Sequence, residues 1–335
     1  MNSRSYLKPL SSLASLLVAL AVVLALFPVD TAAAAYSAQG GQGPQGQPPA
    51  SFTQGLQNRC VPLKIIPQFV NRQQIQNKGF YLDLYGSGSL SFAKEAHRKY
   101  ATFQLGPDPS AQYNASRMTE ADTSLPPDQR VKCWQPTTHR DVVIDFTVRF
   151  KQAATPTELT ENLTLWNSPL GTGGEALPMT VIGVARSPMY SGYVAVVVQD
   201  LNLQNFVSTT MQIMPMPDWL DPTDWHQVRI RASQQKVLIE AAQGRHAYTP
   251  VLQVALPEPI DEPLAFEFSL DNEIYPGVMS PVSTPDSLDV AFLSMRYALP
   301  MRSGWPAFTG VPHSPYDNPL AMLSRFVASL RRAHK

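Results

Sequence analysis

The clearest pattern in the chain is an alternation of apolar and polar residues that begins at Trp225. In the run Trp225–Arg231, Val228 and Ile230 alternate with glutamine and arginine. Successive side chains of a β-strand point to opposite faces, so this run predicts a strand with one buried and one water-facing side. The runs Lys236–Glu240 and Ala265–Asp271 repeat the alternation after turn residues. Three such runs in succession are typical of an antiparallel sheet.

Runs of the same kind recur along much of the chain. They predict further strands at residues 79–85, 100–105, 141–151, 163–166, 179–185, 193–199, 209–214 and 287–298. The run 193–199 is almost entirely apolar, so we expect it to be buried on both faces. In the last run, Leu288, Val290 and Phe292 are expected to share one face.

The segments between these runs complete the prediction of fold class. The polar, proline-rich segment Gly106–Arg130 is expected to be a long surface loop. His226 lies on the apolar side of its run, so we expect a core histidine whose ring is hydrogen-bonded. The pattern as a whole predicts an all-β protein, an antiparallel two-sheet β-sandwich.

The N-terminal part of the chain departs from this pattern. Residues 1–35 combine basic residues, an apolar stretch and an alanine cluster, which is typical of a secretory signal peptide cleaved near Ala34 or Ala35. An uncleaved membrane anchor is the alternative, because the apolar stretch approaches the length of a spanning helix. Residues 36–57 are rich in Gly, Gln and Pro and predict a disordered linker. We therefore expect a secreted or extracytoplasmic protein, with the cell envelope as a candidate location.

The C-terminal part changes character again after the sandwich domain, which is expected at residues 58–305. Residues 306–335 predict an irregular tether followed by a short amphipathic α-helix, with apolar residues at helical spacing and basic residues in the last turn. We expect this helix to dock on the sandwich. The alternative is a helix that contacts a membrane or a partner.

Charge and cysteine content narrow the environment and the partners. The chain has 26 Lys and Arg residues and 26 Asp and Glu residues, for a formal net charge of zero. Because no basic excess is present to neutralise phosphates, nucleic acid is not expected as a partner. Cys60 and Cys133 are an even pair in a chain expected to be exported, which predicts a disulfide that closes a loop of about 70 residues. Two unpaired buried thiols are the alternative.

The order of the strongest runs resembles a known superfamily. The sequence Trp-His-Gln-Val-Arg-Ile begins at Trp225, Val-Leu-Ile follows at Val237, Pro-Leu-Ala-Phe-Glu-Phe at Pro263, and Leu-Asp-Val-Ala-Phe at Leu288. This succession resembles concanavalin A-like and laminin G-like sandwiches over roughly residues 141–298, and it implies a jelly-roll arrangement. The superfamily includes lectins, carbohydrate-binding modules, glycoside hydrolases and adhesion modules. The Glu-Xaa-Asp-Xaa-Xaa-Glu motif of its endoglucanase branch is absent, which favours a non-catalytic protein.

One group of polar residues in the run that starts at Ala265 has three interpretations. Glu267 and Ser269 alternate with apolar residues and are expected to face water together with Asp271. Asp271 and Glu273 are also a candidate acid and nucleophile, because alternate residues on a strand stand about 6–7 Å apart and glycosidase carboxylates work at such separations. In the third interpretation, Asp271, Asn272 and Glu273 provide oxygen ligands for calcium, the candidate cofactor.

Aromatic residues beside loops are the other candidates for recognition of a sugar. Trp219 is flanked by Asp218 and Asp221, and Tyr190 and Tyr193 lie next to another loop. An aromatic ring offers an apolar face to the C–H face of a pyranose, and carboxylates accept hydrogen bonds from its hydroxyls. We therefore expect a secreted, non-catalytic domain that binds carbohydrate or a cell-envelope surface. The alternatives are a glycoside hydrolase-like enzyme with paired carboxylates and a structural envelope protein without a ligand.

Overall fold

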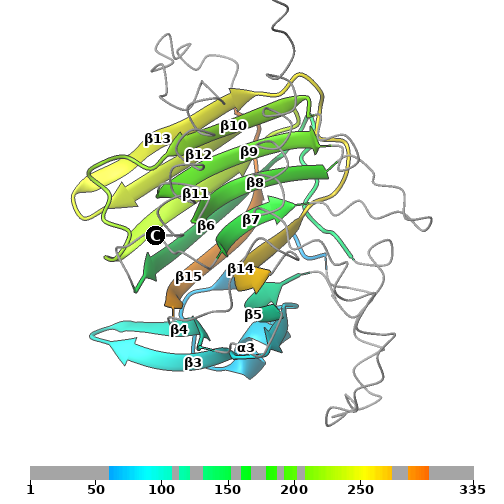
Figure 1. The fold of residues 1–335 in the computed structure, drawn as a ribbon. Coiled ribbons are helices and arrows are strands. Elements are labelled where there is room, and N and C mark those ends of the chain that lie inside the picture. The colour runs from blue at the N-terminus through cyan, green and yellow to red at the C-terminus, as the bar shows by residue number, and fades with distance from the viewer. Residues whose placement is uncertain are drawn as a thin grey trace, which may run out of the picture.

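The computed structural model of the chain describes residues 60–107, 113–120, 131–151, 160–166, 179–186, 192–201, 208–273 and 286–301. In these residues, strands form two antiparallel sheets that lie face to face as two layers (Figure 1). The predicted all-β sandwich is confirmed. The predicted signal peptide, linker and C-terminal helix lie outside the described residues and stay predictions. No helix within the described ranges is long and apolar enough to cross a membrane.

The first layer is an eight-stranded sheet. Its strands are β1 (Leu63–Ile66), β3 (Gly88–Glu95), β4 (Arg98–Leu105), β6 (Asp141–Phe150), β11 (His226–Ala232), β12 (Lys236–Gln243), β13 (His246–Ala255) and β15 (Asp286–Ala298). Their order across the sheet is β13-β12-β11-β6-β15-β4-β3, and β1 pairs with β15. Strands β3 and β4 form a hairpin at one edge of this sheet.

The second layer is a seven-stranded sheet. Its strands are β2 (Tyr81–Tyr85), β5 (Tyr113–Thr119), β7 (Thr160–Trp166), β8 (Met179–Arg186), β9 (Tyr193–Leu201), β10 (Thr210–Pro215) and β14 (Ala265–Glu273). Their order is β10-β9-β8-β7-β14-β5-β2. One short helix, α3 (Arg72–Asn77), precedes β2, and the side chain of Asn71 caps it by accepting a hydrogen bond from Gln74 N at 2.9 Å.

The last two strands in the sequence occupy the middle of the two sheets. Strand β15 lies between β6 and β4, and β14 lies between β7 and β5. On one side of each central strand lie strands from the N-terminal part of the chain, β1 to β5. On the other side lie strands from its middle part, β6 to β13.

The core fills the space between the sheets and follows the predicted alternation. In β11, His226, Val228, Ile230 and Ala232 are buried, while the residues between them are half-buried or exposed. The opposite sheet contributes Phe266 and Phe268, whose rings contact those of Phe80, Phe103 and Phe146. The run 193–199 is buried throughout, as expected, although β9 lies only one strand from the sheet edge.

The expectation of a surface loop over Gly106–Arg130 is wrong for its central part. Residues Tyr113–Thr119 form β5, which pairs with both β2 and β14. The strand escaped notice because its buried residues include polar ones. The side chain of Asn114, for example, accepts hydrogen bonds from Ser87 N at 2.7 Å and Ser87 Oγ at 2.9 Å, which compensates for the loss of water.

Two local irregularities also separate the structure from the sequence pattern. A register shift between Val290 and Phe292 marks a bulge in β15, so the expectation that Leu288, Val290 and Phe292 share one face is wrong. Leu288 and Val290 belong to the core, while Phe292 is only half-buried. Strand β13 was not expected from the sequence because Pro250 interrupts it. Because β13 is an edge strand, it can contain Pro250, which has no backbone N–H group.

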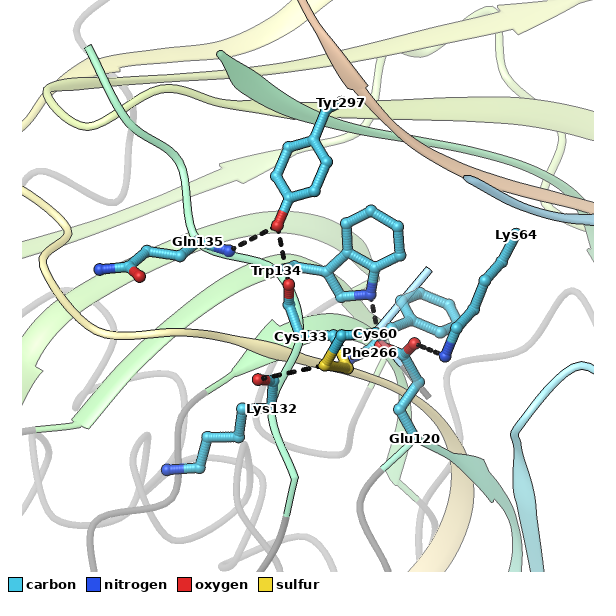
Figure 2. The surroundings of a disulfide bond; sticks show 9 residues. All are labelled: Cys60, Lys64, Glu120, Lys132, Cys133, Trp134, Gln135, Phe266 and Tyr297. Atoms are coloured by element: carbon cyan, nitrogen blue, oxygen red, sulfur yellow. Dashed lines mark hydrogen bonds and ion pairs between the residues drawn. A yellow bond between two sulfur atoms is a disulfide. The ribbon is translucent and has the colours of Figure 1, made fainter. Parts of the chain in front are cut away.

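The predicted disulfide is confirmed and lies beside a buried polar cluster. Cys60 and Cys133 are bonded, with their Cα atoms 5.0 Å apart. Figure 2 shows Glu120 between the Lys64 ammonium group and the Trp134 indole. Trp134 Nε1 donates to Glu120 Oε2 at 2.6 Å, and Phe266 N donates to the same oxygen at 3.0 Å. The disulfide, the end of β5 and the start of β14 are therefore held together.

The outer face of the eight-stranded sheet carries a network of ion pairs. Asp145 accepts from Arg229 Nε at 2.6 Å and also pairs with Arg296. Asp141, whose side chain is fully buried, accepts from Arg231 Nε at 2.7 Å. These pairs join neighbouring strands across the sheet, so each aspartate has a cationic partner that compensates for its removal from water.

Candidate functional site

The outer face of the seven-stranded sheet changes from polar to apolar across its width. One row of directly opposed residues crosses all seven strands: Tyr81, Thr119, Glu267, Thr164, Gly183, Val196 and Ile213. Opposed residues of antiparallel strands lie on the same face of a sheet. The row is therefore polar from β2 to β7 and lacks polar side chains from β8 to β10.

A buried ion pair lies at the centre of the polar part. Arg117 Nε lies 3.5 Å from Glu267 Oε1, and the exposed fractions of the two side chains are 5% and 7%. Tyr81 and Asp83 of the edge strand β2 lie opposite Thr119 and Arg117 and are half-buried. We refer to Tyr81, Asp83, Arg117, Thr119, Thr164, Glu267 and Ser269 as the polar half-face. A buried ion pair adds little net stability to a fold.

Ser269 is the least satisfied member of the polar half-face. It lies opposite Arg117, its residue is 0% exposed, and its Oγ has no hydrogen-bond partner among the described residues. A buried hydroxyl without a partner costs about 1–3 kcal/mol. Ser116 on the adjacent strand is equally buried, but its Oγ donates to Ser89 O at 2.7 Å. The comparison shows that the fold can satisfy a buried serine in this region.

The expectation that Glu267 and Ser269 face water is wrong. Both residues are buried, because β14 is covered on both faces and not only on its core side. Asp271 and Glu273 lie at the end of β14 opposite Ala115 and Tyr113, but their side chains are outside the described part of the chain.

The proposed acid and nucleophile and the proposed calcium ligands, including Asn272, therefore stay predictions. Within the described ranges, no group of three or more His, Cys, Asp or Glu side chains is arranged to hold a metal ion.

The predicted aromatic site around Trp219 lies in the loop before β11. The Trp219 ring stacks on that of His246, with centroids 4.5 Å apart and planes 14° apart. Asp221 closes a turn, because its Oδ1 accepts from Thr223 N at 2.8 Å and Thr223 Oγ1 at 2.7 Å. These bonds hold the pKa of Asp221 below its ordinary value. Asp218 is exposed. A role for Trp219, Asp218 and Asp221 in ligand binding stays a prediction.

Tyr193 was expected beside a loop as a sugar-binding aromatic, and this expectation is wrong. Its ring is buried in the core, where it contacts Phe150 edge-on at 4.9 Å. Tyr193 of β9 lies opposite Arg186 of β8. Opposed residues share a face, and both side chains are buried. Tyr190 lies outside the described residues, so its predicted role is untested.

His226 is the hydrogen-bonded core histidine that the sequence predicted. One ring nitrogen, Nε2, lies 3.3 Å from the Tyr193 hydroxyl, and Nδ1 lies 3.0 Å from Asp224 O. Burial lowers the pKa of His226 to about 4, although the bond to Asp224 favours the charged form. The ring is therefore neutral at physiological pH and takes a structural role.

Sequence reasoning missed most of the polar half-face. Arg117 lay inside the segment expected to be a loop, and the tyrosines of β2 were interpreted only as part of a strand. One signal was present: Tyr81, Asp83 and Tyr85 alternate with leucines, which places a tyrosine–carboxylate row on one face. Nothing in the sequence alone shows that this row continues onto β5 and β14.

No protein family model and no curated protein matches the chain. Among solved structures, the chain is similar to a prokaryotic β-1,3-1,4-glucanase (lichenase) derived from a mouse hindgut metagenome, at 12% identity and a TM-score of 0.46, covering 70% of this chain and 99% of that one. It is also similar to a laminarinase from Flavobacterium sp. UMI-01, at 9% identity and a TM-score of 0.45, covering 69% and 98%. Lectin II from Ulex europaeus matches at 11% identity and a TM-score of 0.39, covering 71% and 98%. The matches thus include two glucanases and a lectin, the kinds of protein that the expected resemblance names.

Proposed function

We propose that the protein is a non-catalytic carbohydrate-binding protein that holds a glycan on the polar half-face. The observation that carries this proposal is Ser269, a buried hydroxyl that lies opposite Arg117 and has no hydrogen-bond partner within the described ranges. Native folds rarely leave such a group unsatisfied, and a glycan that enters from the half-buried edge at Tyr81 and Asp83 would provide its partner. In the same row, Val196 of β9 and Ile213 of β10 are apolar. The outer face of this sheet therefore does not require polar residues for folding.

The chemistry of the polar half-face suits sugar hydroxyls, which both donate and accept hydrogen bonds. Arg117 provides donors, Glu267 provides acceptors, and Ser269 provides both. Tyr81 and Tyr85 lie on the edge strand β2, and Tyr85 is 48% exposed. Aromatic rings therefore border the polar half-face at the edge from which a ligand would approach it. Polar groups that fix orientation beside apolar rings are the usual composition of small-molecule sites.

Two serine variants test the proposal. Ser269→Ala removes a hydroxyl that has no partner in the part of the chain that the structure describes, so the free energy of unfolding is expected to stay equal or to rise by up to about 1 kcal/mol. Its affinity for a glycan selected on an array is expected to fall about tenfold, the usual effect of one hydrogen bond of about 1.4 kcal/mol. Ser116→Ala is the matched control: it breaks the bond to Ser89 and is expected to lose about 1 kcal/mol of stability without loss of affinity.

Either of two results would contradict the proposal. If Ser269→Ala binds the selected glycan as tightly as the parent protein, the polar half-face is not the site. If a reducing-sugar assay shows release of sugar from the bound glycan, and the release is lost in Glu273→Gln, the protein is a hydrolase. Calcium is included and withheld in both assays, so a metal requirement is detected at the same time.

A further inference from the structure

A second cluster with binding chemistry lies on the other sheet, at the tip of the β3–β4 hairpin (cyan in Figure 1). Trp225, immediately before β11, has two guanidinium groups over its ring: the Cζ atoms of Arg98 and Arg149 lie 4.6 Å and 4.5 Å from the ring centroid. The Tyr100 ring meets Trp225 edge-on at 5.4 Å. Lys151 Nζ lies 5.6 Å from the centroid of Tyr100. We name these five residues the Trp225 cluster.

The acidic residues beside the Trp225 cluster already form ion pairs with its cations. Asp289 is fully buried and accepts from Arg149 Nε at 2.8 Å and Lys151 Nζ at 2.7 Å. Glu95 pairs with Arg149 at 2.9 Å. The hydrogen bond from Trp225 and the charge of Arg149 lower the pKa of Glu95, so this carboxylate is ionised.

Arg98 differs from the other cations of the cluster. It is exposed and makes no ion pair with any acidic side chain of the described residues, although Glu95 lies opposite it in the hairpin. The ring of Trp225 contacts its guanidinium group, and the residue as a whole is exposed. Lys94 is also exposed, and Lys99 is half-buried beside it in register. The hairpin tip therefore has an excess of positive charge within a chain of zero net charge.

We propose that the Trp225 cluster binds a carboxylate-bearing polysaccharide, one built from uronic acid units. A guanidinium group matches a carboxylate with two parallel hydrogen bonds, and Arg98 is an exposed guanidinium group without an ion-pair partner among the described residues. Lys94 and Lys99 form the pair next to Glu95 and Arg98, so they lie on the other face of the hairpin and the cations do not form the dense stripe that suits nucleic acid. No exposed large apolar residue belongs to the cluster, so a membrane lacks the apolar anchor that it requires.

This site goes beyond the proposed function, because it lies on the other sheet and takes an acidic ligand. Neutral sugar rings have no free platform here, since both guanidinium groups lie over the Trp225 ring. The polymer is therefore recognised by charge, and binding weakens as salt screens the contacts.

The experiment measures binding of the full chain to polygalacturonate, with neutral dextran and double-stranded DNA as comparison polymers. Arg98→Gln is expected to bind polygalacturonate about tenfold more weakly, and raising salt from about 0.05 to 0.5 M is expected to weaken the parent protein by a similar factor. Arg245→Gln is the matched control, because Arg245 is an exposed arginine in the β12–β13 turn at the opposite edge of the same sheet. This variant is expected to bind like the parent.

Three results would overturn the proposal. Equal losses in Arg98→Gln and Arg245→Gln would show that only overall charge matters. Binding that does not respond to salt would exclude recognition by charge. DNA that binds as tightly as polygalacturonate would show a general polyanion surface. Ser269→Ala is expected to bind polygalacturonate normally, so failure of this site and failure of the polar half-face are distinguished.

Discussion

Acidification is expected to weaken the fold through one buried histidine. The ring of His226 is 1% exposed and lies against Phe150 and Tyr193, where a positive charge is poorly solvated. The pKa is lowered from 6.5 to about 4. In the unfolded chain the same side chain takes up a proton near its ordinary pKa, so falling pH favours the unfolded state.

The size of the effect follows from the two pKa values. Above pH 6.5 both states are neutral and the full stability is present. As pH falls through 6.5 toward 4, the free energy of unfolding decreases by about 2 kcal/mol at pH 5 and about 3 kcal/mol at pH 4, and it levels off below that. Burial raises the pKa of Asp286, which acts in the opposite direction because a protonated carboxyl favours the folded state. A comparison of variants is therefore needed to isolate the histidine.

The assay is urea unfolding at pH 7.5, 6 and 5, with the free energy extrapolated to zero denaturant. His226→Gln removes the titrating ring and is expected to flatten the pH dependence by about 2 kcal/mol between pH 7.5 and 5. His139→Gln, at an exposed turn, is the matched control and is expected to keep the parent slope. If His226→Gln retains that slope, the buried histidine is not its source and the reasoning is refuted.

Two further predictions concern the cluster in Figure 2. Cys60→Ser combined with Cys133→Ser is expected to lower the free energy of unfolding by about 4 kcal/mol, because the bond closes a loop with a sequence separation of 73 residues; urea unfolding without reductant measures this, and an unchanged midpoint would contradict it. Glu120→Gln leaves the Lys64 ammonium group buried without its partner and is expected to cost about 3–5 kcal/mol in thermal unfolding. Adding Lys64→Met is expected to recover more than half of that loss, and a double variant as unstable as the single one would show that the pair is not coupled.

The sequence predicted those features that depend on neighbours along the chain. Alternation placed Val228 and Ile230 in the core and identified His226 as a core residue, because side-chain direction in a strand depends only on parity. The disulfide was predictable from the even cysteine count and the expected export. The fold class followed from the number and spacing of the alternating runs.

Features that depend on distant parts of the chain were not predictable in the same way. Parity correctly placed Glu267 and Ser269 on the face opposite Phe266 and Phe268, but it could not show that this outer face is buried. The position of Tyr193 next to a loop suggested exposure, whereas its ring lies in the core. The ion pairs of Asp145, Asp289 and Glu120 join residues far apart in sequence, so they become visible only when strand order and register are known.

The central positions of β14 and β15 impose an order on biosynthesis. A ribosome releases the chain from its N-terminus, so the strands on both sides of each sheet emerge before the strands that join them. The partners of β5 and β7 are missing until residue 273 is available, and the partners of β4 and β6 are missing until residue 298 is available. Open edges of this kind pair readily with other chains. A truncation that removes only the last 50 residues would therefore remove the central strand β15 of the larger sheet and not an edge strand. A nascent chain that lacks β15 is expected to require protection from aggregation.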